Sequence, residues 1–391
     1  MTAQVSAGRV SFNALLLSAD GTGIRTLILG LLGGFKQIHP PEEFVVYLRQ
    51  GLGADPELPR WRGCRYVEIP RTRSLVGRVA AELLLLSRYD RDLGVRVAYS
   101  PTSYLPLGQS VPAVATIVDL VWRLVPADVP IVRRLSLRFR MESSLTQAAG
   151  LVAISESVRG EALAAFGNRL KASIRVLPLG VDGRFFDVER NGVKRGETLI
   201  LASGGTDSRK GVDTLLDAVA ALPVSLARRI RLVVTGPREE RRVEELLQRT
   251  DGWLRERIDF PGFVSIQELM HLFSQADLFV YPSRYEGFGL PVLEAMAAGI
   301  PVICSDLPVL REVGGDCVSY FPVGSAAGLA QRLLRVLTNE PIRANVVADG
   351  RAKAREYTWE RTAGILLEVL RSVRGEMNPC PSSSSPLGRE G

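Results

Sequence analysis

Histidine and cysteine are scarce in this chain of 391 residues, which holds 2 of the former and 4 of the latter. The cysteines show neither metal-ligand nor redox spacing, which argues against a disulfide framework and for a reducing cytosol. They are Cys64, Cys304, Cys317 and Cys380. His39 and His271 stand far apart in the sequence. We therefore expect no metal site.

Long apolar runs are absent as well. No stretch approaches about eighteen uninterrupted apolar residues, so the sequence predicts no membrane-spanning helix. The run at 14–17 is too short for the core of a signal peptide. Hydrophobic residues nevertheless make up 46% of the chain, which is ample for two cores. We expect a cytoplasmic protein, with peripheral contact on the inner membrane face as the alternative to free solution.

The net charge of +7 lies entirely in the first half of the chain. Residues 1–182 contain 22 Lys and Arg against 15 Asp and Glu, whereas the remainder contains 27 of each kind. Four arginines interleave with apolar residues: Arg133, Arg134, Arg138 and Arg140. Such a surface suits an anionic membrane or a phosphorylated lipid, and an ordinary solvated surface is the alternative. No nucleic-acid-binding module accompanies the charge, so no nucleic acid is expected.

Short apolar strands alternate with helical stretches, which is the pattern of parallel βαβ units. In the first half, strands are expected at 10–17, 43–49, 65–70, 95–100, 113–119, 151–154 and 174–178. In the second half, they are expected at 198–203, 230–235, 257–260, 278–282, 301–304 and 317–321. The sequence thus predicts the α/β class, with two doubly wound, Rossmann-like domains that face a central cleft.

A polar, glycine-bearing stretch separates the two sets of strands. We predict an N-terminal domain at 1–182, a linker at 183–196 and a C-terminal domain at 197–357. Residues 358–376 carry an apolar stripe that predicts a terminal helix. The low-complexity residues 377–391 are expected to be disordered.

The segment SRYEGFGLPVLEAMAAGIPVICSD, at 283–306, combines a strand end, a glycine-rich turn and a helix start. Gly287 and Gly289 allow the backbone to turn tightly against a ligand. The free amides and partial positive charge of a helix N-terminus favour an anion such as phosphate. Glu286 and Glu294 could then reach hydroxyl groups on either side of that phosphate. A solvent-facing or capping role is the alternative for Glu294.

A second turn in the same half carries two adjacent cations. Gly205 follows a strand, and Arg209 and Lys210 come next, before a helix expected near Val212. Ligands of open α/β sheets bind outside the carboxyl ends of the strands, so these cations can neutralise a diphosphate. An ordinary surface pair is the alternative. In the first half, Gly21 and Gly23 flank a turn between a strand and a helix, so this turn can approach phosphate or an acceptor closely.

With these motifs, the chain resembles glycosyltransferase family 4, the retaining, nucleotide-sugar-dependent transferases with the GT-B fold. The resemblance covers most of the chain. Its further segments are TIVDL at 116–120, AISESVR at 153–159, VLPLGVD at 176–182, LASGGTDSRKGVDTLLDA at 201–218, LFVYPS at 278–283 and LREVGGD at 310–316. In the resembled fold, the terminal helix crosses back to pack on the first domain.

The resemblance implies a role for each candidate residue. Arg209 and Lys210 would hold the donor diphosphate. Glu294 would accept hydrogen bonds from the ribose hydroxyls, and Glu286 would contact the transferred sugar as a catalytic residue. The other implied donor-binding residues are Gly205, Gly287, Phe288, Gly289 and Leu290, and the implied acceptor or phosphate loop holds Gly21 and Gly23. No cofactor is implied, because the nucleoside diphosphate sugar, GDP- or UDP-linked, is a substrate.

One departure from the family bears on catalysis. Many members carry a His-Asp pair at the end of the strand expected at 113–119, where this chain has Val118 and Asp119. Neither histidine of the chain matches, so we expect no histidine-based catalysis. Asp119 is the nearest remaining polar candidate for a sugar or acceptor hydroxyl, and a simple turn role is its alternative.

The resemblance implies a metal-independent, retaining hexosyltransferase of polysaccharide biosynthesis. GDP-mannose is the first expectation for the donor, and a glycan or lipid-linked hydroxyl is the expected acceptor. Because Val118 replaces the usual histidine, the alternative is a catalytically silent nucleotide-sugar-binding subunit that regulates or scaffolds a partner transferase. A relative that phosphorylates, epimerises or hydrolyses is a third possibility.

Overall fold

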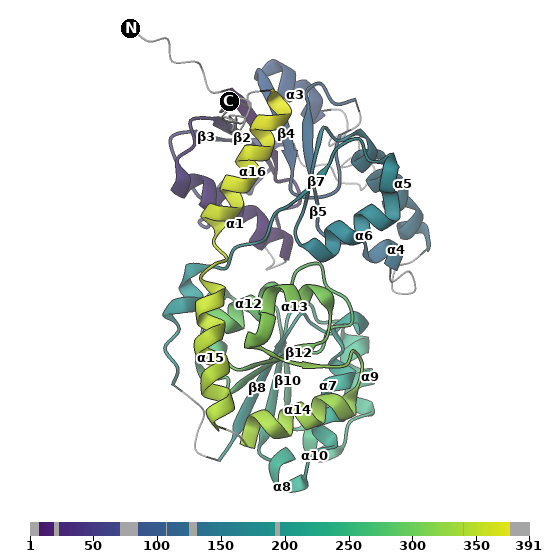
Figure 1. Cartoon of the computed structure of the whole chain (residues 1–391), viewed down its shortest axis with the longest axis vertical. Helices are drawn as coiled ribbons and strands as arrows, with labels where there is room; N and C mark the ends of the chain where they lie inside the picture. Colours follow the sequence, from purple (N-terminus) through teal and green to yellow (C-terminus); the bar gives the residue numbers. More distant parts are fainter. Residues whose placement is uncertain are drawn as a thin grey trace, which may run out of the picture.

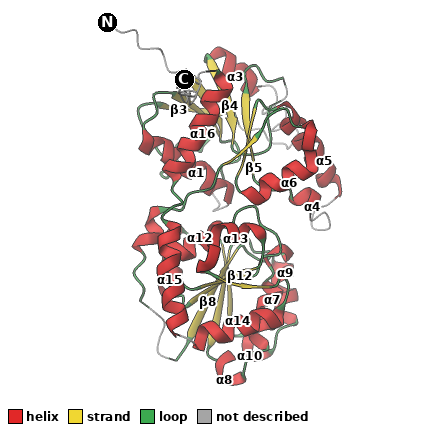
Figure 2. Ribbon diagram, viewed as in Figure 1, coloured by secondary structure: helices red, strands yellow, loops and turns green. Residues whose placement is uncertain are grey.

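The computed structural model describes residues 8–18, 23–70, 85–106, 108–124, 131–191, 196–338 and 340–375. Within these ranges, two parallel sheets each form the centre of one half of the molecule (Figure 1). Helices pack around both sheets (Figure 2). Most strand residues are buried, as expected for parallel sheets whose two faces are both covered. The predicted α/β class is confirmed.

The first sheet has the strand order β3-β2-β1-β4-β5-β6-β7. Its strands are β1 (Arg9–Asn13), β2 (Glu43–Arg49), β3 (Cys64–Ile69), β4 (Val95–Ser100), β5 (Ala113–Ile117), β6 (Gly150–Ala153) and β7 (Ile174–Val176). The accompanying helices are α1 (Gly23–Ile38), α3 (Leu86–Asp92), α4 (Val121–Leu124), α5 (Ile131–Gln147) and α6 (Glu156–Phe166), with a 3₁₀ turn η3 (Gly167–Arg169).

The second sheet has the order β10-β9-β8-β11-β12-β13. Its strands are β8 (Thr198–Ser203), β9 (Ile230–Thr235), β10 (Ile258–Gly262), β11 (Leu278–Tyr281), β12 (Val302–Ser305) and β13 (Ser319–Phe321). The helices are α7 (Val212–Ala220), α8 (Val224–Ala227), α9 (Glu240–Gln248), α10 (Gly252–Arg255), α11 (Ile266–Gln275), α12 (Leu290–Ala297), α13 (Pro308–Gly314), α14 (Ala326–Thr338), α15 (Glu340–Ala354) and α16 (Trp359–Arg374). Three 3₁₀ turns, η4 (Gly183–Asp187), η5 (Ser208–Lys210) and η6 (Gly315–Cys317), complete the described elements after β7.

Each strand expected from the sequence has a counterpart, but three strands, β1, β5 and β7, end two or more residues earlier than expected; β7 ends at Val176 instead of residue 178. β1 ends at Asn13 instead of residue 17, because the Asn13 side chain accepts a hydrogen bond from the Leu15 N–H (3.1 Å) and turns the chain. β5 ends at Ile117 instead of residue 119, and the Asp119 carboxylate accepts from the Val121 N–H (3.2 Å) in the same way. Asp119 therefore lies in a turn beyond the strand.

The last helix, α16, belongs by sequence to the end of the chain but packs on the first half (Figure 1). It lies against α1, where Gly34 leaves room for the backbone of Trp359: a Cβ at Gly34 would stand 2.2 Å from the Trp359 carbonyl oxygen. An ion pair between Arg371 and the buried Glu42 (2.7 Å) fixes its other end. The linker predicted at 183–196 falls between the strands of the two sheets.

Some predictions fall on residues outside the described ranges. These are Gly21 and the tail at 377–391. In the part of the chain that the structure describes, no helix is both long and apolar enough to cross a membrane.

Candidate active site

The two predicted donor-site turns meet because their strands are neighbours. β8 and β11 lie side by side in the second sheet, so the turns that follow them share one edge. The Lys210 ammonium lies 2.7 Å from Glu286 Oε1 and 3.2 Å from the Tyr281 hydroxyl. The Ser283 hydroxyl donates to the same Glu286 oxygen (2.5 Å). The structure thus brings together Lys210 and Glu286, which the sequence predicted to share a site.

Arg209 is held in a defined place beside this pair. Asp207 caps the short turn η5 through the Arg209 N–H (2.9 Å), and its carboxylate also accepts from the Arg209 guanidinium (2.8 Å). The Arg209 carbonyl accepts from the Arg284 N–H (2.7 Å) of the neighbouring turn. Gly211 has φ 65°, and a Cβ there would stand 2.1 Å from the Pro282 carbonyl oxygen. The two turns are therefore locked to each other by their backbones.

Gly205 lets the turn after β8 pack closely against the turn after β9. Its φ is 78°, and a Cβ would lie 2.1 Å from the carbonyl oxygen of Pro237. Its N–H donates to the Thr235 carbonyl (2.9 Å), so this amide is already used within the fold. A side chain at this position would separate the turn after β8 from the turn after β9.

The turn from Gly287 to Leu290 leads into α12. Gly289 has φ 105°, which favours glycine, and Leu290 is the first residue of the helix. The first amides of a helix have no intrahelical acceptor, so they remain suited to an anion. The Phe288 ring is buried and packs edge-on against Tyr357, so only the backbone of Phe288 could face a ligand.

Glu294 lies one helical turn further along α12 and is half-buried. Its carboxyl makes no hydrogen bond to any described residue, which leaves it able to bind a ligand's hydroxyl groups. Burial, together with the negative charge of Asp182, raises the pKa of Glu294 to about 7. Asp182 is itself paired with Arg184 (2.6 Å).

Asp119 approaches the same cluster from the first half of the molecule. Burial raises the pKa of its carboxyl, and the positive charges of Arg209 and Lys210 oppose this shift while Glu286 adds to it. Asp119 thus shares the electrostatic environment of the charged pair, although it is far away in the sequence. Val118, which precedes it, has its carbonyl oxygen 2.1 Å from where a Gly287 Cβ would stand. The carboxyl ends of the two sheets therefore meet at this point.

The predicted glycine loop of the first half is described only in part. Gly23 is the first residue of α1, and a Cβ there would meet nothing within 4 Å. Two residues later, Arg25 pairs with Asp55 (2.8 Å) and Glu57 (2.5 Å). This charge cluster tethers the start of α1 to the loop after β2.

No metal centre is evident in the described ranges, where no three His, Cys, Asp or Glu side chains are arranged to hold an ion. The sequence does contain two aspartates separated by one residue, Asp90 and Asp92, a spacing that can hold a metal ion. Asp90 is buried in α3 and accepts a hydrogen bond from the Tyr47 hydroxyl (2.7 Å), so it has a packing role.

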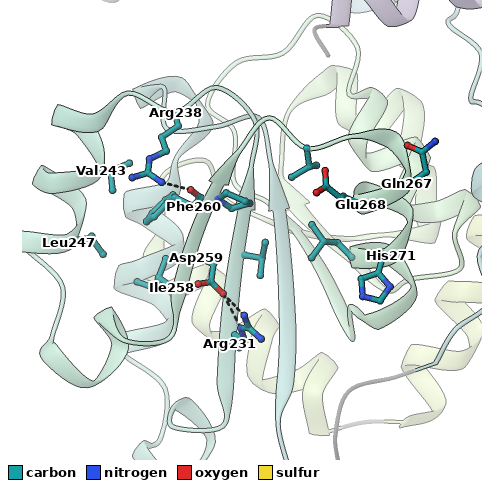
Figure 3. A pocket seen from close by; sticks show the side chains of 14 residues that line it. Arg231, Arg238, Val243, Leu247, Ile258, Asp259, Phe260, Gln267, Glu268 and His271 are labelled. Atoms are coloured by element: carbon teal, nitrogen blue, oxygen red, sulfur yellow. Dashed lines mark hydrogen bonds and ion pairs between the residues drawn. The ribbon is translucent and has the colours of Figure 1, made fainter. Parts of the chain in front are cut away.

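A separate cavity of about 790 Å³ lies at the edge strand β10, away from this cluster (Figure 3). Val243 of α9 lines one side, and Glu268 and His271 of α11 line the other. Arg231 pairs with Asp259 (2.6 Å) along the strands between them. None of the predicted site residues lines this cavity.

Sequence reasoning missed several residues that complete the site. Tyr281 and Ser283 bond to the Lys210–Glu286 pair, and Asp207 holds Arg209. Their positions at strand ends gave a weak signal, because polar residues beyond a parallel strand often line a ligand site. Tyr285 gave no signal, since both of its partners are more than a hundred residues away in the sequence.

Comparisons with known proteins agree with this arrangement. Residues 184–353 match the model of the family Glycosyl transferases group 1. The chain is 36% identical over 161 residues to the O-antigen chain mannosyltransferase B of Escherichia coli. This aligned region covers 40% of this chain and 41% of that protein. It is 33% identical over 181 residues to a phosphatidyl-myo-inositol mannosyltransferase of Mycobacterium leprae (strain TN), covering 46% and 47%. The matched region spans less than half the length of both relatives.

Solved structures extend the likeness to nearly the whole chain. Sucrose-phosphate synthase from Thermosynechococcus elongatus superimposes with a TM-score of 0.76 at 21% identity, over 95% of this chain and 100% of that one. Anabaena HepE, solved in complex with UDP and glucose, gives a TM-score of 0.71 at 17% identity, over 93% and 100%. The narrower assignment to family 4 stays a prediction. The whole chain has the GT-B fold, and its residues 184–353 match the model of the glycosyl transferases group 1.

Proposed function

We propose that this protein is a glycosyltransferase that moves a hexose from a nucleoside diphosphate sugar to a hydroxyl group of a glycan or lipid-linked acceptor. The observation that carries the proposal is the cluster of Arg209, Lys210 and Glu286 beside the start of α12. Cations and helix amides suit a diphosphate, and carboxylates suit sugar hydroxyls. The relatives named above are mannosyltransferases, which supports GDP-mannose as the first donor to test. HepE, solved with UDP and glucose, supports UDP sugars as the second.

The roles of the two glutamates follow from their surroundings. Glu286 is fixed by Lys210 and Ser283 at the carboxyl end of the second sheet, so we assign it to the transferred sugar. Glu294 has no protein partner among the described residues, and we assign it to the ribose hydroxyls. We assign Asp119, which enters from the first half, to a hydroxyl of the acceptor or of the sugar.

We further propose transfer with retention at the sugar's anomeric carbon. The bond from this carbon to the phosphate oxygen breaks, and the acceptor oxygen bonds to the same face of the carbon. The leaving phosphate oxygen takes the proton of the acceptor hydroxyl, so no histidine base is needed. The protein contributes positioning and stabilisation of the developing charges.

The positive charge for this step comes, in our proposal, from Arg209, Lys210 and the amides of α12. We therefore expect transfer to continue in excess EDTA. Activity that disappears with the chelator and returns with Mn²⁺ or Mg²⁺ would contradict a metal-independent reaction.

A silent nucleotide-sugar-binding subunit is not favoured. The charged residues expected of an active donor site are all present, and Lys210 and Glu286 are held in contact. A binding-only relative would have less need of both carboxylates. Substituting His at Val118 tests this alternative: if neither the wild type nor Val118→His transfers sugar while both bind donor, the silent subunit becomes the better interpretation.

The donor site is tested by calorimetric titration with GDP-mannose, UDP-glucose and the free nucleotides. A matched donor should bind the wild type, and replacing Arg209 and Lys210 by Ala should remove about 2–4 kcal/mol of binding free energy, because charge-assisted contacts are lost. The double variant Arg229→Ala/Arg231→Ala is the matched control, since these arginines lie near the opposite end of the same sheet. Equal affinity of the folded site variant and the wild type would contradict the assignment.

We also propose peripheral contact of the first half with an anionic membrane that carries the acceptor. The net positive charge of residues 1–182 supports this proposal. On α5, Phe139 is 72% exposed, and the neighbouring Arg138 is exposed as well. An apolar ring beside a cation on one helix surface suits the headgroup region of a bilayer.

A further inference from the structure

Several direct contacts between the two halves lie at the turn that carries Glu286. The Tyr285 hydroxyl accepts a hydrogen bond from the Leu120 N–H (3.0 Å), and it donates to Glu161 Oε2 (2.9 Å). Leu120 follows β5, and Glu161 lies on α6, so both partners belong to the first half. One side chain of the second half thus bridges two elements of the first.

Neighbouring contacts support the same junction. The Ser155 hydroxyl donates to the Gly287 carbonyl (2.8 Å). The Glu312 carboxylate accepts from the N–H groups of Glu156 (2.9 Å) and Ser157 (3.3 Å) at the start of α6. A carboxylate at a helix N-terminus is favoured by the partial positive charge there. These groups come together only when the two halves are in contact.

The position of Tyr285 in the chain gives the bridge a consequence for the site. Tyr285 directly precedes Glu286, and Leu120 directly follows Asp119. The hydrogen bond between Tyr285 and Leu120 therefore fixes the separation of two carboxyl groups that come from different halves. Glu161 fixes the direction of the Tyr285 hydroxyl, because its carboxylate accepts the one hydrogen bond that the hydroxyl can donate.

We propose that Tyr285 is a positioning residue, which closes the two halves on each other and sets Asp119 against Glu286 for the transfer step. We call the hydrogen-bonded group of Tyr285, Leu120 and Glu161 the Tyr285 clasp. The inference rests on the proposed function, because it assigns these residues to the placement of acceptor and donor. The clasp contributes little to holding the nucleotide, since Arg209, Lys210 and Glu294 lie in the second half alone.

The first test compares Tyr285→Phe with Tyr320→Phe. Tyr320 donates to the Gly315 carbonyl (2.7 Å) within the second half, so this control also loses a hydroxyl but leaves the clasp intact. Tyr285→Phe should lower kcat about tenfold, with nucleotide affinity within about twofold of the wild type, because both hydrogen bonds of the clasp are lost. Equal kcat for Tyr285→Phe and the wild type, or an equal loss in the Tyr320 control, would overturn the proposal.

Glu161 provides a conservative rescue. Glu161→Gln keeps a side-chain oxygen that can accept from Tyr285, so it should retain most of the activity, whereas Glu161→Ala should lower kcat, though by less than Tyr285→Phe because the Leu120 N–H can still donate to the hydroxyl. Thermal unfolding of each variant identifies any that fail to fold. Equal activity of Glu161→Gln and Glu161→Ala would contradict the role of the hydroxyl's direction.

A second readout does not depend on transfer. Small-angle X-ray scattering should give a larger radius of gyration for Tyr285→Phe than for the wild type or Tyr320→Phe, because the halves separate more often. If the wild type transferred no sugar, the proposed function would fail, and the scattering comparison would still decide whether the clasp closes the halves. Identical scattering from all three proteins would overturn the clasp.

Discussion

At the residue scale, the fold disturbs the charge of Glu294 near neutral pH. Its carboxyl is half-buried and has no bonding partner among the described residues, and burial raises its pKa to about 7. The folded protein therefore binds this proton more tightly than the unfolded chain, in which the pKa is near 4.5. The resulting contribution to stability is complete below pH 4.5 and is lost as the pH rises through 7.

Glu294→Gln should remove this pH dependence. Glutamine keeps the shape of the side chain and stays neutral, so the variant should gain stability over the wild type as the pH rises from 5 to 8. The gain at pH 8 should be at most about 3 kcal/mol, because folding raises the pKa of Glu294 from 4.5 to about 7. Urea unfolding at both pH values measures it, and Glu244→Gln, an exposed glutamate on α9, is the control. A stability difference that does not change with pH would show that Glu294 keeps an ordinary pKa.

At the scale of elements, the sequence predicted the strands well because a short run of apolar residues is a local signal of a buried strand. It placed β8 and β9 at their observed bounds, since apolar runs bounded by polar turns mark buried parallel strands. It assigned Lys210 and Glu286 to one donor site because both motifs lie in the same half, and the structure brings them together because β8 and β11 are neighbouring parallel strands that end at one edge. It could not predict the short turn η5, because the ion pair of Arg209 with Asp207 that holds it leaves no periodic pattern. Nor could it predict the Tyr285 clasp, which depends on how two separately folded sheets meet.

The packing of α16 on α1 gives a test with a matched control in consecutive residues. A Cβ at Gly34 would stand 2.2 Å from the Trp359 carbonyl, whereas a Cβ at Gly33 would meet nothing within 4 Å. Gly34→Ala should therefore destabilise the protein by about 1–3 kcal/mol, because the backbone of α16 must shift. Gly33→Ala should be neutral or stabilise the protein by up to about 1 kcal/mol, since alanine favours the helix. Urea unfolding decides it, and equal effects of both substitutions would mean that α16 does not pack closely on α1 in solution.

At the scale of the whole molecule, the net positive charge and the proposed donor site lie in different halves. The second half is neutral overall and carries the proposed donor site, while the first half carries the net charge of +7. An anionic membrane would attract the first half. Each exposed Lys or Arg near an anionic surface contributes only about 1 kcal/mol and is screened within a Debye length, so such docking must depend steeply on salt.

Liposome sedimentation tests this proposal. At low salt, the wild type should sediment with vesicles that contain an acidic phospholipid and stay in the supernatant with neutral vesicles, and added salt should release it. Neutralising the four arginines of α5, Arg133, Arg134, Arg138 and Arg140, should abolish sedimentation without changing nucleotide affinity, because the donor site lies in the other half. The control neutralises four exposed arginines of the second half, Arg228, Arg241, Arg332 and Arg335, and should sediment like the wild type. If the wild type stays in the supernatant with acidic vesicles at low salt, the basic surface is an ordinary solvated one, and the acceptor reaches the site from solution.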